Sequence, residues 1–392
     1  MNGMNYFIQE ERKAEFLYWR NGDYNSYFNK KKELYRTAGN SFCKERQNPV
    51  GGVYQNDIKY AGDLELAFLI DREEKEFRYV RKRLNRHEYG ERLQKLICHR
   101  NQYAKTAGYG NYLDYKYDLW GIEDTVLNRV SAKHTGRPRT DMMQLKKMLS
   151  EISTNALLYA ENQNTLLKQV SDYWNLNLDN IHIHDKDLPE FYIGACVPIS
   201  IPDDVHVLMN KVSGLSGFSV FMHEIGHAFY YSNIAEEDIN GKREPFNLIV
   251  EETIALIFEN QVYTKDFLTC FLGIDKDMWF LKANAQLSYL LCCARFEENI
   301  YKTETPDFDK EWKKACDLVG EPEGEGWIKP HFFVSNPGYF AAYFIAYYLA
   351  KEIYLYANKD SKKLFDFLKN EICKPGIKLQ YDLFLDKILG KW

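Results

Sequence analysis

A histidine pair four residues apart constrains this chain more than any other feature. His223 and His227 enclose the pentapeptide His-Glu-Ile-Gly-His within an apolar run from Phe218 to Tyr231. The run predicts a buried helix, and positions i and i+4 of a helix lie on one face, so both imidazoles can bind a single zinc ion. Glu224 lies one step around the helix, where its carboxylate can reach a water molecule on that ion. A metal-activated water beside a general base indicates hydrolytic chemistry.

A catalytic zinc ion usually takes three protein ligands and leaves one position for water. The apolar segment from Asn247 to Asn260 contains three glutamates that could supply the third ligand, Glu251, Glu252 and Glu259. Buried acids need a partner, and a cation is the simplest one; the alternative is that these acids face solvent. Spacing does not choose among the three. Glu259 lies two turns from Glu252 on nearly the same face, so it could instead orient a ligating histidine.

The bulk composition excludes several classes of protein. The chain has 392 residues and a net charge of −5, which argues against a nucleic-acid-binding protein that depends on a basic surface. Its apolar stretches are too short to span a bilayer, and its first residues lack the pattern of a signal peptide. The eight cysteines show no CxxC spacing, which favours reduced thiols. We therefore expect a cytoplasmic protein that binds neither nucleic acid nor membranes.

Helical patterns dominate the chain. Residues 5–37 and 61–106 repeat apolar side chains at steps of three and four residues, and similar patterns return after the predicted zinc helix begins. The helical pattern stops between Ile181 and Lys211, where β-branched residues cluster in Cys196–Ile201 and Val205–Met209. These clusters predict a small β-sheet in a mainly α-helical fold.

The pairing of the His-Glu-Ile-Gly-His helix with a glutamate-bearing helix resembles the thimet oligopeptidase and oligoendopeptidase F family of zinc peptidases. In that family the glutamate ligand follows the first histidine at the interval that separates His223 from Glu252, so the resemblance selects Glu252 as the third zinc ligand. The resemblance implies a mainly α-helical zinc-peptidase fold with a deep substrate groove and a small β-sheet beside the active-site helix. Further segments are similar to family segments: Arg100–Tyr115, Val207–Lys211, Ala294–Glu297 and His331–Tyr343.

The last of these segments carries further site predictions. Its family counterpart supplies a histidine and tyrosines that contact the substrate, which implies that Tyr343, helped by Tyr339 or His331, stabilises the negative charge that develops on the carbonyl oxygen. Tyr339, Tyr343 and Tyr347 recur every four residues and therefore form one helix stripe. As a bare pattern, such a stripe is typical of core packing, which is the alternative interpretation.

The chain also departs from the family pattern. It is much shorter than typical members, with a reduced N-terminal region and a reduced stretch before the zinc helix. The family's Pro-Ser-Gln after the glutamate ligand is replaced by residues 253–256, Thr-Ile-Ala-Leu, and its acidic pair before the zinc helix by Ser216 and Gly217. These departures leave the metal ligands in place, and they bear on the depth of the groove and the peptide lengths that it accepts.

Together these features predict a zinc-dependent endopeptidase that hydrolyses short or unfolded peptides. An N-terminal helical region, residues 1–94, would pack on a catalytic region, residues 95–392, and the peptide would pair with an edge strand at Val207–Lys211. The alternatives are a carboxypeptidase or precursor-processing peptidase of narrow specificity, and a peptide-binding protein that has lost turnover. The oligomeric state and the identity of the native divalent ion stay open at this level.

Overall fold

The computed structural model describes residues 3–45, 63–134, 144–150, 163–185, 188, 193–210, 214–234, 248–320, 326–357, 359–375 and 388. The chain forms two compact units, each built from separate segments of the sequence. The first unit comprises Met1–Ala38, Asp141–Ala283 and Ala346–Trp392, and the second comprises Gly39–Thr140 and Asn284–Ile345. The division at residue 94 stays a prediction.

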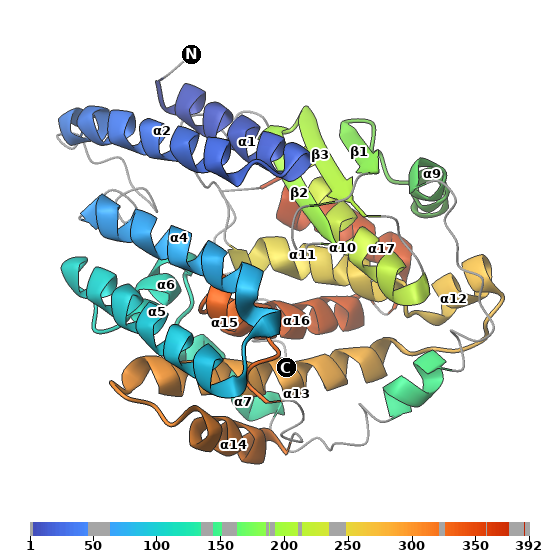
Figure 1. Ribbon diagram of the computed structural model, residues 1–392. Helices are drawn as coiled ribbons and strands as arrows, with labels where there is room; N and C mark the ends of the chain where they lie inside the picture. The colour runs from blue at the N-terminus through green and yellow to red at the C-terminus, as the bar shows by residue number, and fades with distance from the viewer. Residues whose placement is uncertain are drawn as a thin grey trace. The chain divides into compact units, whose positions relative to one another are not determined.

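The prediction of a mainly α-helical fold with a small β-sheet is confirmed (Figure 1). The first unit contains α1 (Gly3–Asn21), α9 (Gln163–Trp174), β1 (Ile181–Asp185), β2 (Gly194–Ser200), β3 (Asp204–Met209), α10 (Gly214–Ser232), α11 (Leu248–Gln261), α12 (Lys265–Leu272), α17 (Ser361–Phe367) and the π-helix η4 (Leu368–Cys373). The second unit contains α4 (Leu64–Val80), η2 (Arg81–Arg83), α5 (Arg86–Thr106), α6 (Tyr112–Trp120), α7 (Asp124–His134), α14 (Phe308–Val319) and α15 (Phe332–Ser335). Helices α2 (Tyr24–Glu45), α13 (Trp279–Lys302) and α16 (Tyr339–Tyr356) have residues in both units.

The sheet of the first unit has the order β1-β3-β2. Strand β3 pairs in parallel with β1 and antiparallel with β2, so it is the central strand. The prediction that Val207–Lys211 forms an edge strand is therefore wrong for the part that the structure describes, residues 207–210, and Lys211 lies outside it. The reason is that β1 pairs with the second side of β3. The alternating histidines of β1 make it less apolar than the other two strands, so its sequence is a weaker signal of a strand.

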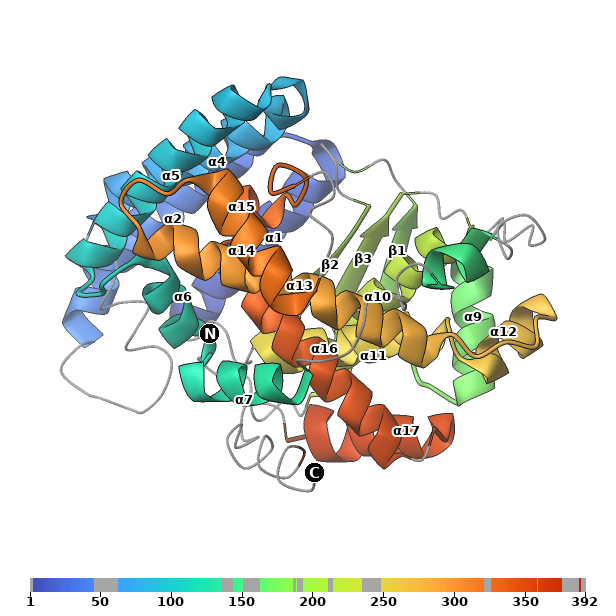
Figure 2. The same ribbon diagram turned by 90° about the horizontal axis from the view of Figure 1, so that it is seen from below.

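The two faces of the sheet are covered by different helices. Because side chains alternate along a strand, Gly194, Cys196 and Met209 share the face that packs on α10. The opposite face packs on α1, where Phe16 joins Val197 and Leu208 in one buried apolar cluster. Figure 2 shows the strands standing beside α10, which places the sheet next to the histidine pair.

Aromatic side chains build the core of the first unit behind α10 and α11. Phe258 of α11 lies between Phe229 and Phe365, with ring centroids 5.1 and 4.9 Å away. Trp174 of α9 closes the cluster against Phe365 at 4.8 Å. These rings hold α10 and α11 firmly against each other and leave the other side of the pair for the polar residues described below.

Helices α4 and α5 pack side by side in the second unit (Figure 2). Asn85 begins α5 with a capping box, in which its side chain accepts the Glu88 N–H and the Glu88 carboxylate accepts the Asn85 N–H. Phe77 and Tyr89 then meet between the two helices, with ring centroids 4.8 Å apart. No helix of the described residues is both long enough and apolar enough to cross a lipid bilayer.

Candidate metal centre

Helix α10 brings the two histidines of the sequence motif together. His223 and His227 are one helical turn apart, and their Nε2 atoms lie 3.2 Å from each other. Both side chains are largely buried, with 11% and 13% of their surface exposed. A separation of 3.2 Å is within hydrogen-bond distance, and it is also close to the spacing of two nitrogen ligands on one zinc ion.

Gly226 explains how a second helix reaches this pair. A Cβ atom built on Gly226 would lie 2.6 Å from the Ala255 Cα, too close for two carbon atoms that are not bonded to each other. The absence of a side chain therefore lets the backbones of α10 and α11 approach each other at this point. Ala255 is one turn from Glu252, so the close approach carries the Glu252 carboxylate to the histidines.

The three ligand atoms have the spacing of a metal site. Glu252 Oε2 lies 3.5 Å from His223 Nε2 and 3.7 Å from His227 Nε2, and only 2% of the Glu252 residue is exposed. Tetrahedral zinc with ligand bonds of about 2.0–2.2 Å requires ligand atoms about 3.3 Å apart. The triangle of 3.2, 3.5 and 3.7 Å fits that requirement, so the residues present are compatible with a bound divalent metal ion.

The two other glutamates of α11 have different roles. Glu251 accepts a hydrogen bond of 2.9 Å from the Tyr231 hydroxyl. Glu259 Oε2 is in hydrogen-bond contact with His223 Nδ1 at 3.1 Å, while its Oε1 lies 3.7 Å from Lys282 Nζ. Glu259 therefore fixes the ring orientation of His223 from behind, the arrangement that leaves Nε2 for a metal. Lys282, on a distant part of the chain, carried no signal in the sequence.

The charges around the histidines favour a cation. Burial lowers the pKa of His223, but the Glu259 and Glu252 carboxylates outweigh it and raise that pKa to about 9. Burial and the neighbouring His223 hold the pKa of His227 well below its ordinary value. One positive charge is thus stabilised beside the two acids. A divalent cation would replace the proton on His223 Nε2, while Nδ1 keeps its contact with Glu259.

Glu224 lies on the sheet side of α10. Burial raises the pKa of its carboxyl to about 7, and the Cys196 backbone N–H donates a hydrogen bond to it. A Cβ atom at Gly194 would lie 2.8 Å from the Glu224 Cγ, so strand β2 passes directly against this side chain. A hydrogen bond from a backbone N–H can come from almost any residue, so the sequence could not predict that Cys196 contacts Glu224. Gly194 is the one residue here whose type indicates a close approach.

The remaining predicted site residues lie in the second unit. The His331 ring is tilted against the Phe332 ring, with centroids 4.1 Å apart, and the Phe332 centroid lies 5.1 Å from that of Tyr339 and 5.9 Å from that of Tyr343. The structure thus brings His331, Tyr339 and Tyr343 into one aromatic group, whereas the metal ligands belong to the first unit. Tyr347, the next member of the stripe, is buried in the first unit and donates to Asn260 Oδ1 at 3.0 Å. The catalytic roles of the first three stay predictions.

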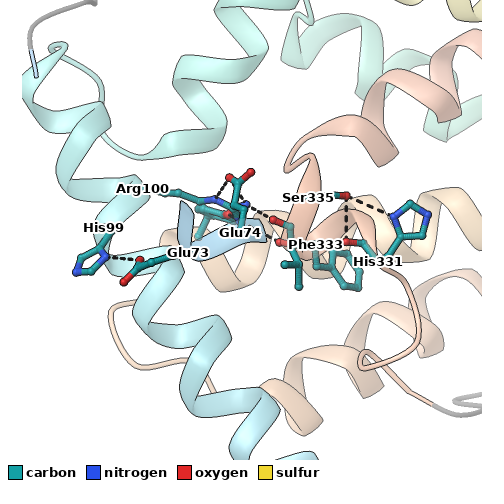
Figure 3. A network of polar contacts seen from close by, with 9 residues as sticks. Glu73, Glu74, His99, Arg100, His331, Phe333 and Ser335 are labelled. Atoms are coloured by element: carbon teal, nitrogen blue, oxygen red, sulfur yellow. Dashed lines mark hydrogen bonds and ion pairs between the residues drawn. The ribbon is translucent and has the colours of Figure 1, made fainter. Parts of the chain in front are cut away.

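A buried arginine holds the segment that carries His331 (Figure 3). Arg100 is fully buried, and its guanidinium donates to the Glu74 carboxylate at 2.7 Å and to the Phe333 carbonyl at 2.9 Å. The guanidinium also donates to the Val334 carbonyl. In the next residue, Ser335, the hydroxyl oxygen lies 3.4 Å from His331 Nδ1. Burial, with Arg81 and Arg78 nearby, lowers the pKa of His331 to about 4, so its imidazole is neutral at physiological pH.

Comparison with solved structures identifies the fold. A carboxypeptidase from Pyrococcus furiosus, in its Apo-Mg form, superposes with a TM-score of 0.72 over 99% of this chain and 93% of that one, at 15% identity. A protein from Bacillus anthracis strain Ames that is named as an oligoendopeptidase F gives 0.72 over 98% of this chain and 86% of that one, at 13% identity. PZ peptidase A, solved with an inhibitor, gives 0.61 over 84% and 66%, at 14% identity.

No protein-family model and no curated protein matches the sequence. At identities of 13–15% the structural likeness establishes the fold, and the prediction of an oligoendopeptidase F-like helical peptidase fold is confirmed.

Proposed function

We propose that this protein is a zinc-dependent peptidase that hydrolyses short or unfolded peptides. The observation that carries the proposal is the buried triangle of His223, His227 and Glu252, with the Glu224 carboxylate on the same helix. The triangle occurs in a fold shared with proteins named as carboxypeptidase and oligoendopeptidase F. A divalent ion held by these three residues would polarise the scissile carbonyl and make water a stronger nucleophile.

Glu224 supplies the proton transfers in this proposal. With a pKa near 7, its carboxylate accepts a proton from the attacking water at neutral pH and then delivers that proton to the leaving amine. The Cys196 N–H holds the carboxylate in one orientation during both steps. Glu259 and Lys282 keep the His223 ring fixed, which maintains the geometry of the site.

Strand β2 is the proposed guide for the substrate. It is an edge strand of the described sheet, and its Gly194–Cys196 part lies against Glu224. A peptide that pairs with the open side of an edge strand would present its main chain to the metal group. The groove, and substrate contacts from Tyr343, Tyr339 and His331, are part of this proposal.

The test replaces the general base without changing its shape. Glu224→Gln should lower kcat for peptide hydrolysis by at least about 10²–10⁴-fold, because the amide cannot accept the proton. Its zinc content, measured by inductively coupled plasma mass spectrometry, should match that of the wild type. Glu251→Gln is the matched control, because Glu251 faces Tyr231 and should leave the rate unchanged. A Glu224→Gln enzyme with wild-type kcat would sink the proposal.

A carboxypeptidase is the second candidate function, favoured by the superposition on the Pyrococcus furiosus enzyme. Digestion of a mixed peptide library, read by mass spectrometry, separates the two. Cuts at internal bonds support an endopeptidase, whereas stepwise loss of single C-terminal residues supports the carboxypeptidase.

A further inference from the structure

Three histidines and an aspartate gather on the sheet face opposite the candidate metal centre. His182 and His184 alternate along β1, and His206 of β3 is in register with His182, so all three side chains share one face. Asp204, two residues before His206, lies on the same face. Phe16 of α1 covers the inner end of the group, with its ring centroid 4.5 Å from that of His206.

The polar atoms of this group form a continuous chain of contacts. His184 Nε2 lies 2.8 Å from His206 Nδ1, and His206 Nε2 lies 2.8 Å from Asp204 Oδ1. His182 Nε2 lies 3.6 Å from the same Asp204 oxygen. The side chain of His206 is 13% exposed, whereas that of His182 is 51% exposed, so His206 is fixed and His182 can turn.

This order of contacts assigns a tautomer to His206. When its Nε2 carries the hydrogen and donates to Asp204, its Nδ1 presents a lone pair to His184. A carboxylate that accepts the far N–H of an imidazole is the usual support behind a metal-binding histidine. Two imidazoles from one strand and one from its neighbour form a nitrogen set that suits zinc, nickel or copper rather than magnesium or calcium.

We propose that His184 Nε2, His206 Nδ1 and His182 bind a divalent transition-metal ion, with Asp204 orienting His206. The ion takes the place of the proton shared by His184 and His206. The two nitrogens must then separate from 2.8 Å to about 3.3 Å, the spacing of tetrahedral zinc ligands. His182 Nε2 lies beside Asp204, at the other edge of the His206 ring, so this half-exposed side chain must turn toward His206 Nδ1 to complete the set. This site is separate from the His223 group and does not depend on the proposed peptidase activity.

Metal counting on the full-length chain tests the proposal. Protein stripped with a chelator is dialysed against buffered Zn²⁺, and the bound ions are counted by inductively coupled plasma mass spectrometry. The wild type should bind two ions, the double variant His184→Gln/His206→Gln one, and His227→Ala one. His87→Gln is the matched control, because His87 is exposed on α5 and should leave two ions bound.

Two conservative variants keep the test decisive if the double variant does not fold. His182→Asn and Asp204→Asn change half-exposed side chains, and the Zn²⁺ affinity of each is measured in the His227→Ala background. The affinity should fall by about 10–100-fold for Asp204→Asn, which loses the support of His206, and it should fall for His182→Asn, which loses a ligand. Copper(II) bound to the His227→Ala protein should show nitrogen hyperfine splitting from imidazoles by electron paramagnetic resonance.

A different result overturns the proposal and leaves the peptidase untouched. A wild type that binds one ion, lost in His227→Ala and retained in the double variant, would mean that the histidines form a hydrogen-bonded chain only. Unchanged Zn²⁺ affinity in both single variants would lead to the same conclusion.

Discussion

At the scale of single residues, Gly226 sets the distance between the histidine helix and the glutamate helix. A methyl group there would meet the Ala255 backbone at 2.6 Å, so α11 would have to move. We expect Gly226→Ala to lower the free energy of unfolding by about 1–3 kcal/mol, since overpacking forces the backbone to shift. Zinc affinity should fall with it, because Glu252 moves away from the imidazoles.

Gly90→Ala is the matched control for this prediction. Gly90 also lies within a helix, but its added methyl would meet the Trp327 ring at 3.4 Å, an ordinary contact distance. Alanine is the better helix former by about 1 kcal/mol, so this variant should be as stable as the wild type or more stable. Denaturant unfolding and competition with a chromophoric zinc chelator measure both quantities. Equal zinc affinity in the two variants would contradict the role assigned to Gly226.

Glu259 is the second residue with a testable positioning role. Its carboxylate contacts His223 Nδ1 and the Lys282 ammonium, so Glu259→Gln keeps the shape and removes the charge. We expect zinc affinity to fall by about tenfold, in the range found when partners of ligating histidines are changed. The affinity of Glu251→Gln, measured in parallel, should stay at the wild-type value. If both variants bind zinc equally well, Glu259 has no part in fixing His223.

At the scale of elements, α15 depends on Arg100. The guanidinium occupies the Phe333 and Val334 carbonyls at the end of a helix of four residues, too short to be stable alone. Arg100→Met should lower the free energy of unfolding by about 3–5 kcal/mol, because the largely buried Glu74 carboxylate loses the guanidinium that donates to it. Arg92→Met changes an exposed residue of α5, the helix that also carries Arg100, and should lower the free energy of unfolding far less. Denaturant titration compares the two variants, and similar losses would contradict this account.

The start of α16 depends on Glu297 in a way that responds to pH. Glu297 is fully buried and accepts the Gly338 N–H at 2.9 Å, while burial raises its pKa from 4.5 to about 8. Between these values the folded chain binds more protons at this residue than the unfolded chain does. The contribution of Glu297 to the free energy of unfolding therefore falls as pH rises from about 4.5 to 8.

Glu297→Gln tests this dependence, because its amide oxygen still accepts the Gly338 N–H and has no charge to bury. The free energy of unfolding of the variant, relative to wild type, should increase as pH rises from 5 to 8. Chemical unfolding at a series of pH values measures the difference. A difference that stays constant across the range would mean that Glu297 titrates at an ordinary value.

At the scale of the whole molecule, a bound metal ion should stabilise the folded chain. An ion that binds only the folded state adds about 2.7 kcal/mol when its concentration is 100 times Kd. We expect a chelator to lower Tm and added zinc to restore it, with a smaller zinc-induced shift in His227→Ala. Differential scanning calorimetry at fixed protein concentration measures these shifts. Equal shifts in the wild type and His227→Ala would argue against metal binding by the His223 group.

The sequence predicted the helical fold because its periodic apolar patterns are long and strong. It also selected His223, His227 and Glu252, the residues that the structure brings together, since helical spacing and family resemblance act on residue identity. It could not place β3 at the centre of the sheet, because the histidines of β1 mask an ordinary strand pattern. The contacts of Glu224 with Cys196 and of Glu259 with Lys282 depend on a backbone group and on a distant segment, and neither leaves a local pattern.

The interleaving of the two units has a consequence for synthesis on the ribosome. Every segment of the second unit is translated before Ala346–Trp392, the last segment of the first unit. The second unit can therefore close while the helices that carry His223 and Glu252 still lack part of their apolar covering. That exposed surface persists until Ala346–Trp392 has been made, so the nascent chain stays open to aggregation, and in need of a chaperone, after its metal ligands have already been made.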